Sequence, residues 1–454
     1  MNTSPTTTGG PAAPLSGART ALILLLAINF FNFFDRQVLA AVVSDIRKEF
    51  FVDGKLKGGF GDETAQWLMN GLQRTFGFNP ENALIGSLAL AFMASYMILA
   101  PLFGWLAERY PRWLLVAFGV ILWSLATGGS GLALTFGVLF LTRCLVGVGE
   151  AAYGPVAPAM ISDYYPVSVR GQVLAWFYVA IPVGSALGYV GGGAVAYLTG
   201  DWRWAFYIAV VPGLILGAWC IFMKEPPRGQ SDLGHAAGPN KAKLSDYGTV
   251  LFTPSYLLCT LGMTAMTFAL GGIGFWMPDY IHNYRGQPNL AQVNLIFGAI
   301  VVVAGLTATL LGGWAGDKLR AKYPGSYFLV SGTALLAGFP ITVAMLYTPF
   351  PFAWVLIFLA CFVLFFNTGP TNTVLANVVH PSLRSTGFAL NILIIHAFGD
   401  AISPMIMGAI AGAYDMNAAF LFVSFLMLVG GLLWLLGAKY LQRDTELAPT
   451  RGPK

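Results

Sequence analysis

Two charged residues stand side by side in the first long apolar stretch of the chain, Asp35 and Arg36. Neighbouring residues on a helix point about 100° apart, so these charges cannot simply neutralise each other and each needs a partner from elsewhere. Asn29, Asn32 and Arg36 recur at helical spacing, which predicts one polar stripe on a single helix face. Ionisable groups are costly inside a membrane, so this stripe marks a candidate functional site.

A second pair of charges, Arg143 and Glu150, lies in the fourth apolar stretch. The two residues are seven positions apart, so they share one helix face at a separation of about 10 Å along the axis. We expect Asp35 to pair with Arg143 and Arg36 to pair with Glu150. The alternative is a static ion-pair network that only orients two helices, although buried pairs stabilise a fold poorly.

The residue types in this group predict two kinds of chemistry. A guanidinium binds phosphate with two parallel hydrogen bonds, so Arg36, followed by Arg143, is the candidate for an anionic headgroup. Asn29 and Asn32 join them as predicted substrate contacts. Asp35 and Glu150 are the candidate proton carriers, because desolvation favours the protonated form of a carboxylate and a nearby arginine opposes it.

The second part of the chain carries fewer charges in its apolar stretches. His396 and Asp400, four residues apart, predict either a proton relay or headgroup contact, or a satisfied packing pair beside Pro404. A polar run near residue 370 suits the wall of a cavity, and hydrogen bonds between helices explain it equally well. The predicted binding residues in that run are Asn367, Thr371 and Asn372.

The composition indicates which elements must hold these residues. Of the 454 residues, 56% are hydrophobic and 10% are charged, whereas a soluble domain carries about 25% charged residues. A soluble enzyme and a nucleic-acid-binding protein are therefore excluded, and the net charge of +5 is scattered between apolar runs. Hydrolytic and nucleotide-binding motifs are absent and the four cysteines lack metal spacing, so we expect no enzymatic activity, catalytic residue, cofactor, metal or nucleic-acid partner.

A membrane-spanning helix needs about 20 apolar residues, and the sequence contains twelve such segments. If both termini are cytoplasmic, most basic residues of the connecting segments also lie on the cytoplasmic side. Cytoplasmic loops of membrane proteins are rich in lysine and arginine, so the sequence favours this orientation. The predicted spans are 19–43, 82–106, 112–131, 134–163, 170–199, 203–224, 255–282, 290–315, 326–347, 351–378, 385–412 and 417–440. They predict a disordered cytoplasmic tail (1–18), a six-helix bundle (19–224), a cytoplasmic linker (225–254), a second six-helix bundle (255–440) and a cytoplasmic tail (441–454).

A short pattern, Gly-Trp-x-x-acid-base, occurs at residues 104–109 and again at 313–318, in equivalent places of the two predicted bundles. The segments 166–170 and 381–384 also match, so we infer a six-plus-six duplication, as in many secondary transporters. The repeated pattern predicts a latch that closes the cytoplasmic side in one state, whereas the simpler interpretation is that charged residues cap short turns. The predicted latch residues are Gly104, Glu108, Arg109, Arg112, Asp163, Arg170, Gly313, Asp317 and Arg384.

The segment 104–112 resembles the loop signature of the major facilitator superfamily, which usually has Asp at the place of Glu108 and Gly at the place of Pro111. The resemblance covers residues 19–440. It implies an all-α integral membrane protein with twelve helices in two bundles, which transports by rocking between two states.

Three stretches, 29–36, 143–151 and 399–404, resemble the Spinster family of lipid transporters. That family is associated with export of sphingosine-1-phosphate and with lysophospholipid transport, in some members coupled to protons. The short termini suggest a bacterial inner-membrane member with its own physiological lipid.

We therefore expect a monomeric secondary transporter of an amphiphilic anionic lipid, with protons as the coupling ion. The alternatives are a proton-coupled exporter of another amphiphile, such as a drug or organic anion, and a signalling protein that uses the fold without transport.

Overall fold

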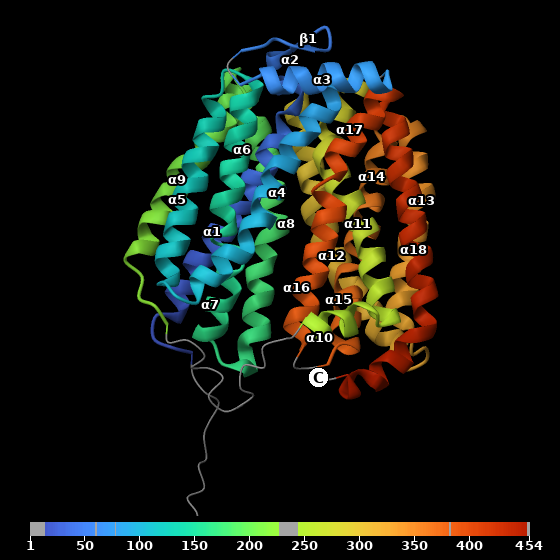
Figure 1. Cartoon of the computed structure of the whole chain (residues 1–454). Helices are drawn as coiled ribbons and strands as arrows, with labels where there is room; N and C mark the ends of the chain where they lie inside the picture. The colour runs from blue at the N-terminus through green and yellow to red at the C-terminus, as the bar shows by residue number, and fades with distance from the viewer. Residues whose placement is uncertain (1–13, 60, 78, 227–243, 381–382, 452–454) are drawn as a thin grey trace, which may run out of the picture.

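The computed structural model describes residues 14–59, 61–77, 79–226, 244–380 and 383–451. The described chain is almost entirely helical and contains twelve helical segments long and apolar enough to cross a membrane, as predicted (Figure 1). These segments group into two sets of six. The first set consists of α1 (Ala18–Ala41), α4 (Glu81–Ala107), α5 (Arg112–Gly131), α6 (Phe136–Ala151) with α7 (Val156–Tyr164), α8 (Val167–Thr199) and α9 (Arg203–Ile221).

The second set follows a short helix, α10 (Leu244–Leu251), and is broken by two π-helical turns, η2 and η4. We call the two sets the first half and the second half. The second half consists of α11 (Pro254–Asp279) with η2 (Tyr280–Tyr284), α12 (Leu290–Arg320), α13 (Ser326–Tyr347), α14 (Phe352–Phe365) with α15 (Thr368–Val378), α16 (Arg384–Ile395) with η4 (His396–Asp400) and α17 (Ser403–Ala413), and α18 (Met416–Leu447) with η5 (Ala448–Thr450).

The predicted spans differ from the observed helices mainly at their ends. Helices α12 and α18 continue beyond the predicted limits of 315 and 440, because their helix-forming residues extend past the apolar part. The tenth span divides into α14 and α15, where Pro370 cannot donate a backbone hydrogen bond. The end of the chain packs onto the second half instead of leaving it as a tail from 441: Asp444 accepts the backbone N–H of Ser255 at 2.8 Å. The predicted tail lies outside the described residues up to residue 13, as does the predicted linker over 227–243.

The polar segment between the first two spans folds into four short elements on one end of the molecule: α2 (Val43–Phe50), β1 (Phe51–Val52), β2 (Lys55–Leu56) and α3 (Glu63–Phe76). The two strands pair antiparallel, and the turn between them uses positive φ at Asp53 and Gly54. We call this end the α3 face. The first helix begins and the last helix ends on the opposite end, which we call the terminal face (Figure 1).

The two halves pack closely near the α3 face. Gly86 of α4 lies against the backbone at Pro404, and Gly193 of α8 lies against Asn294 of α12, so both contacts need the absence of a side chain. A single apolar cluster includes buried residues of both halves, among them Phe34 and Trp276. A separate cluster, which includes Trp113, belongs to the first half alone and extends toward the terminal face.

Candidate functional site

A buried ionic contact joins α1 to α6. The Nη2 and Nε atoms of Arg36 donate to Oε2 of Glu150 at 2.6 and 2.9 Å, which confirms the predicted pair. Asn32, on the same face of α1, lies close enough to Glu150 to stabilise its negative charge. Glu150 is fully buried, whereas the Arg36 side chain is 20% exposed, so the guanidinium is the accessible member of the pair. The Oε1 atom of Glu150 has no hydrogen-bond partner among the described residues.

Aromatic rings surround the same guanidinium. The Cζ atom of Arg36 lies 4.7 Å from the ring centre of Phe33, 4.9 Å from that of Phe92 and 5.6 Å from that of Tyr96. Such contacts stabilise a cation by about 0.5–2 kcal/mol each. Phe92 and Tyr96 were not among the predicted site residues, although their four-residue spacing on α4 indicates one aromatic face. Arg36 therefore lies in a cage that combines an ion pair with an apolar aromatic wall.

The predicted direct pair between Asp35 and Arg143 is wrong. Thr127 of α5 donates a hydrogen bond to Asp35, and Arg143 donates to Ser130 Oγ at 2.7 and 3.2 Å. Both charges are buried, and they interact electrostatically without direct contact. Thr127 and Ser130 of α5 each bond to one of the two charged groups, and neither hydroxyl was among the predicted site residues.

Asn29, the other predicted polar residue of α1, serves packing in this structure. Its side chain is buried and donates to the backbone oxygen of Phe177 at 2.9 Å, which joins α1 to α8. Of the predicted polar stripe, only Asn32 and Arg36 meet Glu150. The role of Asn29 as a substrate contact stays a prediction.

His396 and Asp400 form a pair on η4, with Nδ1 of His396 2.8 Å from Oδ1 of Asp400. The helix departs from helical geometry at Gly399, where φ and ψ are both −109°. The His396 and Asp400 side chains are 27% and 23% exposed. Asp400 acts electrostatically on Arg36 of the first half. The structure is compatible with either predicted role of the pair.

The polar run on α15 is not brought to the interface between the halves as a unit. Asn367 and Thr371 are buried within the second half, where the Asn367 side chain donates to Val363 O at 2.7 Å and Thr371 donates to Asn367 O at 2.7 Å. Asn372 is exposed and donates to Thr368 O at 2.8 Å. Asn367 and Thr371 thus bond to backbone oxygens of their own span, so neither the predicted cavity wall nor the predicted hydrogen bonds between helices is seen for them, and a substrate contact through them would require rearrangement.

The latch residues of the first half contact one another at the terminal face. Arg112 pairs with Asp163 and donates to Glu225 Oε1 at 2.6 Å. Glu108 is 78% exposed and lies 3.7 Å from Arg109. A side chain at Gly104 would meet only open space.

The second copy of the motif also stays within its own half. Tyr327 donates to Asp317 Oδ1 at 2.7 Å, and Arg384 donates to Ala376 O at 2.9 Å. Gly313, like Gly104, has open space at its Cβ position, and the side chain of Arg170 lies outside the described part. A latch between the halves therefore stays a prediction for another state.

A cross-half ionic network that sequence reasoning missed lies on the α3 face. Arg47 of α2 pairs with Asp279 of α11 at 2.8 Å and with Glu81 at 3.2 Å. Ser44 donates to Asp279 at 2.7 Å. Burial lowers the pKa of the Arg47 guanidinium, but the combined effect of Asp279, Tyr284 and Glu81 outweighs it, so the net shift is upward. The sequence placed Asp279 at the outer end of its span but gave no sign of a partner 232 residues away.

The described residues contain no group of three or more His, Cys, Asp or Glu side chains able to hold a metal ion. A partly exposed arginine, a buried carboxylate and an aromatic wall lie together in this arrangement, which supports binding and exchange of charge.

Comparisons with known proteins agree with this architecture. A family model described as Major Facilitator Superfamily matches residues 25–404. Protein spinster homolog 3 of Danio rerio is 32% identical and the match covers 97% of this chain and 90% of that protein. Human protein spinster homolog 1 is 34% identical, over 89% of this chain and 75% of that protein. Protein spinster of Drosophila melanogaster is also 34% identical, over 86% of this chain and 61% of that protein.

Solved structures show the same fold. A bacterial homolog of the human lysosomal transporter Spinster, in an inward-facing and unoccupied conformation, matches with a TM-score of 0.79 at 21% identity, over 95% of this chain and 99% of that chain. A D-xylose-proton symporter matches with a TM-score of 0.68 at 17% identity, over 97% and 100%. This chain is thus a multi-pass membrane protein of the major facilitator superfamily and belongs to its Spinster family of transporters.

Proposed function

We propose that this protein carries an anionic amphiphile, such as a lysophospholipid or a sphingosine-1-phosphate-like lipid, across the membrane by alternating access, with protons as the coupling ion. The observation that carries the proposal is the cage around Arg36. A partly exposed guanidinium is bound on one side by Glu150 and on the other by the rings of Phe33, Phe92 and Tyr96.

The cage suits a ligand with one charged end and one apolar end. A phosphate would approach the exposed side of Arg36 and compete with Glu150 for its N–H groups. The acyl chain of the same molecule would lie against the aromatic rings, which remain apolar when the guanidinium is engaged. Free inorganic anions lack the second contact, so we expect a strong preference for amphiphiles.

Competition for Arg36 provides a route to proton coupling. A buried carboxylate that loses its arginine partner favours the protonated form, because the interior solvates a negative charge poorly. Substrate phosphate on Arg36 would therefore drive proton uptake by Glu150. When the substrate leaves and the ion pair re-forms, the proton would be released.

The packing of the halves supports access from the terminal face in this state. The ionic network of Arg47 and Asp279 and the close contact at Gly86 hold the α3 face together. We propose that the terminal face is cytoplasmic, as the distribution of basic residues predicts. A rocking motion of one half against the other would then expose Arg36 to the α3 face.

The test measures transport in proteoliposomes of lysophosphatidic acid and of monoacylglycerol, which has the same chain without the phosphate. Arg36→Ala should lower lysophosphatidic acid transport at least about tenfold, because one charge-assisted contact of about 1.5–3 kcal/mol is lost. Arg36→Lys should retain part of the activity, since lysine keeps the charge but loses the fork geometry. The exposed Arg74 provides the control, and Arg74→Ala should transport at the native rate.

Native lysophosphatidic acid transport by a folded Arg36→Ala variant would place the headgroup elsewhere and refute the proposal. Equal transport of a short organic anion without a chain would instead favour an exporter of organic anions. Mass spectrometry of the lipids extracted with the purified protein would then identify the physiological substrate.

A further inference from the structure

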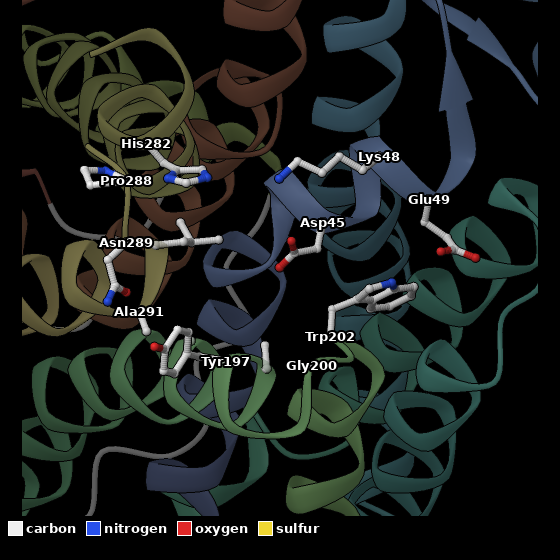
Figure 2. Close-up of a pocket in the computed structure, with 13 residues that line it drawn as sticks. Asp45, Lys48, Glu49, Tyr197, Gly200, Trp202, His282, Pro288, Asn289 and Ala291 are labelled. Atoms are coloured by element: carbon white, nitrogen blue, oxygen red, sulfur yellow. The ribbon is translucent and has the colours of Figure 1, made fainter. Parts of the chain in front are cut away.

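A hollow of about 700 Å³ lies on the α3 face, away from Arg36, where the two halves meet (Figure 2). The first half contributes α2, the end of α8 and the turn before α9, and the second half contributes η2 and the start of α12. Figure 2 shows the Lys48 side chain extending from α2 toward the side of the hollow where His282 lies. None of the lining residues belongs to the cage around Arg36.

The hollow presents a free basic pair. The structure gives Lys48, which is exposed, no hydrogen bond or ion pair with another described residue. The Nδ1 atom of His282 lies 2.7 Å from the backbone oxygen of Gln287, and a carbonyl can only accept, so Nδ1 carries the hydrogen. The Nε2 atom of His282 is therefore left as the atom that a ligand can engage.

A carboxylate lies beside this basic pair. Burial raises the pKa of Asp45, while the charges of Lys48 and His282 lower it, so the three side chains are electrostatic neighbours. Glu49, the second carboxylate of the lining, is occupied by Arg203 at 3.2 Å. The hollow thus offers both signs of charge within one space, which disfavours a simple anion.

Two aromatic residues complete the wall. Trp202 is 5% exposed, and its indole N–H has no hydrogen-bond partner among the described residues. Tyr197 is 67% exposed, and its neighbour Leu198 is 79% exposed, as expected for side chains that face the membrane. Tryptophan and tyrosine prefer the headgroup level of a bilayer, and their rings attract ammonium groups.

We propose that this hollow is a second lipid site, which binds a zwitterionic headgroup carrying both a phosphate and an ammonium group, such as phosphoethanolamine, from the leaflet at the α3 face. Lys48 donates to the phosphate, as does Nε2 of His282 in the doubly protonated imidazole, in which both ring nitrogens are donors. Asp45 and the exposed ring of Tyr197 hold the ammonium group, since the Trp202 ring already contacts the guanidinium of Arg203 at 4.8 Å. The acyl chains lie outside, along the exposed residues of α8. The site does not depend on the function proposed above.

Occupation of this site has a consequence for the conformation. Asp45 and Lys48 belong to the first half and His282 belongs to the second, so one headgroup bridges both. Because rocking separates these elements, the bridging lipid favours the state with a closed α3 face.

The experiment counts bound dioctanoyl phosphatidylethanolamine by native mass spectrometry of the detergent-purified full chain. All variants carry Arg36→Ala, which removes the guanidinium of the central cage and keeps the outcome separate from that of the proposed function. Lys48→Gln should weaken binding at least about tenfold. Asp45→Asn should weaken phosphatidylethanolamine but not dioctanoyl phosphatidate, which has no ammonium group. Lys57→Gln, an exposed lysine on the same face, is the matched control and should bind normally.

Equal affinity of Lys48→Gln and the Lys57→Gln control would overturn the site. Binding of inorganic phosphate as tight as that of the lipid would identify a free-phosphate site and overturn the lipid assignment. A conformational measurement provides a second readout: with spin labels at Leu134 and Tyr414, added lipid should narrow the distance distribution across the α3 face, and Lys48→Gln should abolish that effect.

Discussion

Arg47 and Asp279 join the two halves of the molecule through two parallel hydrogen bonds, Nη1 to Oδ1 at 2.8 Å and Nη2 to Oδ2 at 2.9 Å. Ser44 of the first half and Asn283 of the second half also donate to the same carboxylate, at 2.7 and 2.8 Å. Asp279 is fully buried. Removal of one partner from such a pair leaves an uncompensated charge, which costs about 3–5 kcal/mol. This pair is therefore the strongest candidate for what holds the α3 face closed.

We predict that Asp279→Asn shifts the protein toward a state with an open α3 face. Spin-label distances between Leu134 and Tyr414, both exposed on that face, should lengthen, and those between Phe222 and Tyr323 on the terminal face should shorten. Asp201→Asn, which breaks an ion pair within the first half on the same face, is the control and should change neither distance. Unchanged distances in a folded Asp279→Asn protein would show that the Arg47–Asp279 pair does not hold the α3 face closed.

Glycine packing provides an independent test of the same closure. A Cβ atom at Gly86 would overlap the backbone of α17 at Pro404 and Met405, whereas a Cβ atom at Gly104 on the same helix would meet nothing. Gly86→Ala should therefore destabilise the closed α3 face by about 1–3 kcal/mol, and Gly104→Ala should not. The distance between labels at Leu134 and Tyr414 measures this effect. Identical behaviour of the two variants would contradict the tight contact.

The apolar spans and one ionic pair could be predicted from sequence because each depends on a local signal. Long apolar runs identify membrane helices without reference to partners. The spacing of Arg143 and Glu150 places both on one face of α6, and the pairing of Arg36 with Glu150 follows from the position of both residues near the centres of their spans. The apolar runs and the residue spacing are local properties of the sequence, so they do not depend on how the helices pack.

The remaining contacts depend on how helices rotate and pack, and helical period alone does not determine that rotation. Thr127 and Ser130 separate Asp35 from Arg143, although hydroxyls in an apolar helix usually bond to their own backbone. The side chain of Asn367 points into the second half and bonds to Val363 O. The helical period of the polar run fits this direction and a direction toward the interface between the halves equally well. The Arg47–Asp279 pair joins positions 232 residues apart.

The repeated motif predicts a latch that forms when the terminal face closes. Here Asp317 accepts a hydrogen bond from Tyr327 and Glu108 is largely exposed, and closure of the terminal face would bring both carboxylates toward the opposite half. Asp317→Ala should stabilise the open terminal face, with longer distances between labels at Phe222 and Tyr323. Glu446→Gln, at an exposed carboxylate of α18, is the control. Full transport with unchanged distances in Asp317→Ala and Glu108→Ala would leave only the turn-capping interpretation.

Proton coupling is tested most directly at Asp35 and Glu150, the two buried carboxylates of the first half that interact with Arg143 and Arg36. Asp35→Asn and Glu150→Gln keep the size of the side chain and imitate the protonated form. Exchange of lysophosphatidic acid at equal pH should survive in these variants, because exchange needs no net proton movement. Acceleration by an imposed pH gradient should vanish, because the variant side chain can no longer release and rebind a proton.

The effects of Asp35→Asn and Glu150→Gln on substrate affinity distinguish the roles of the two carboxylates. Glu150 contacts Arg36 directly, so its loss should also change substrate affinity, since phosphate no longer competes with a carboxylate for the guanidinium. Asp35 contacts Thr127 and not Arg36, so Asp35→Asn should alter gradient dependence with little change in affinity. Asp201→Asn and Glu446→Gln control for the substitutions themselves. If both buried variants retain gradient-driven transport, His396 and Asp400 become the coupling pair, and Asp400→Asn then decides between coupled transport and facilitated diffusion.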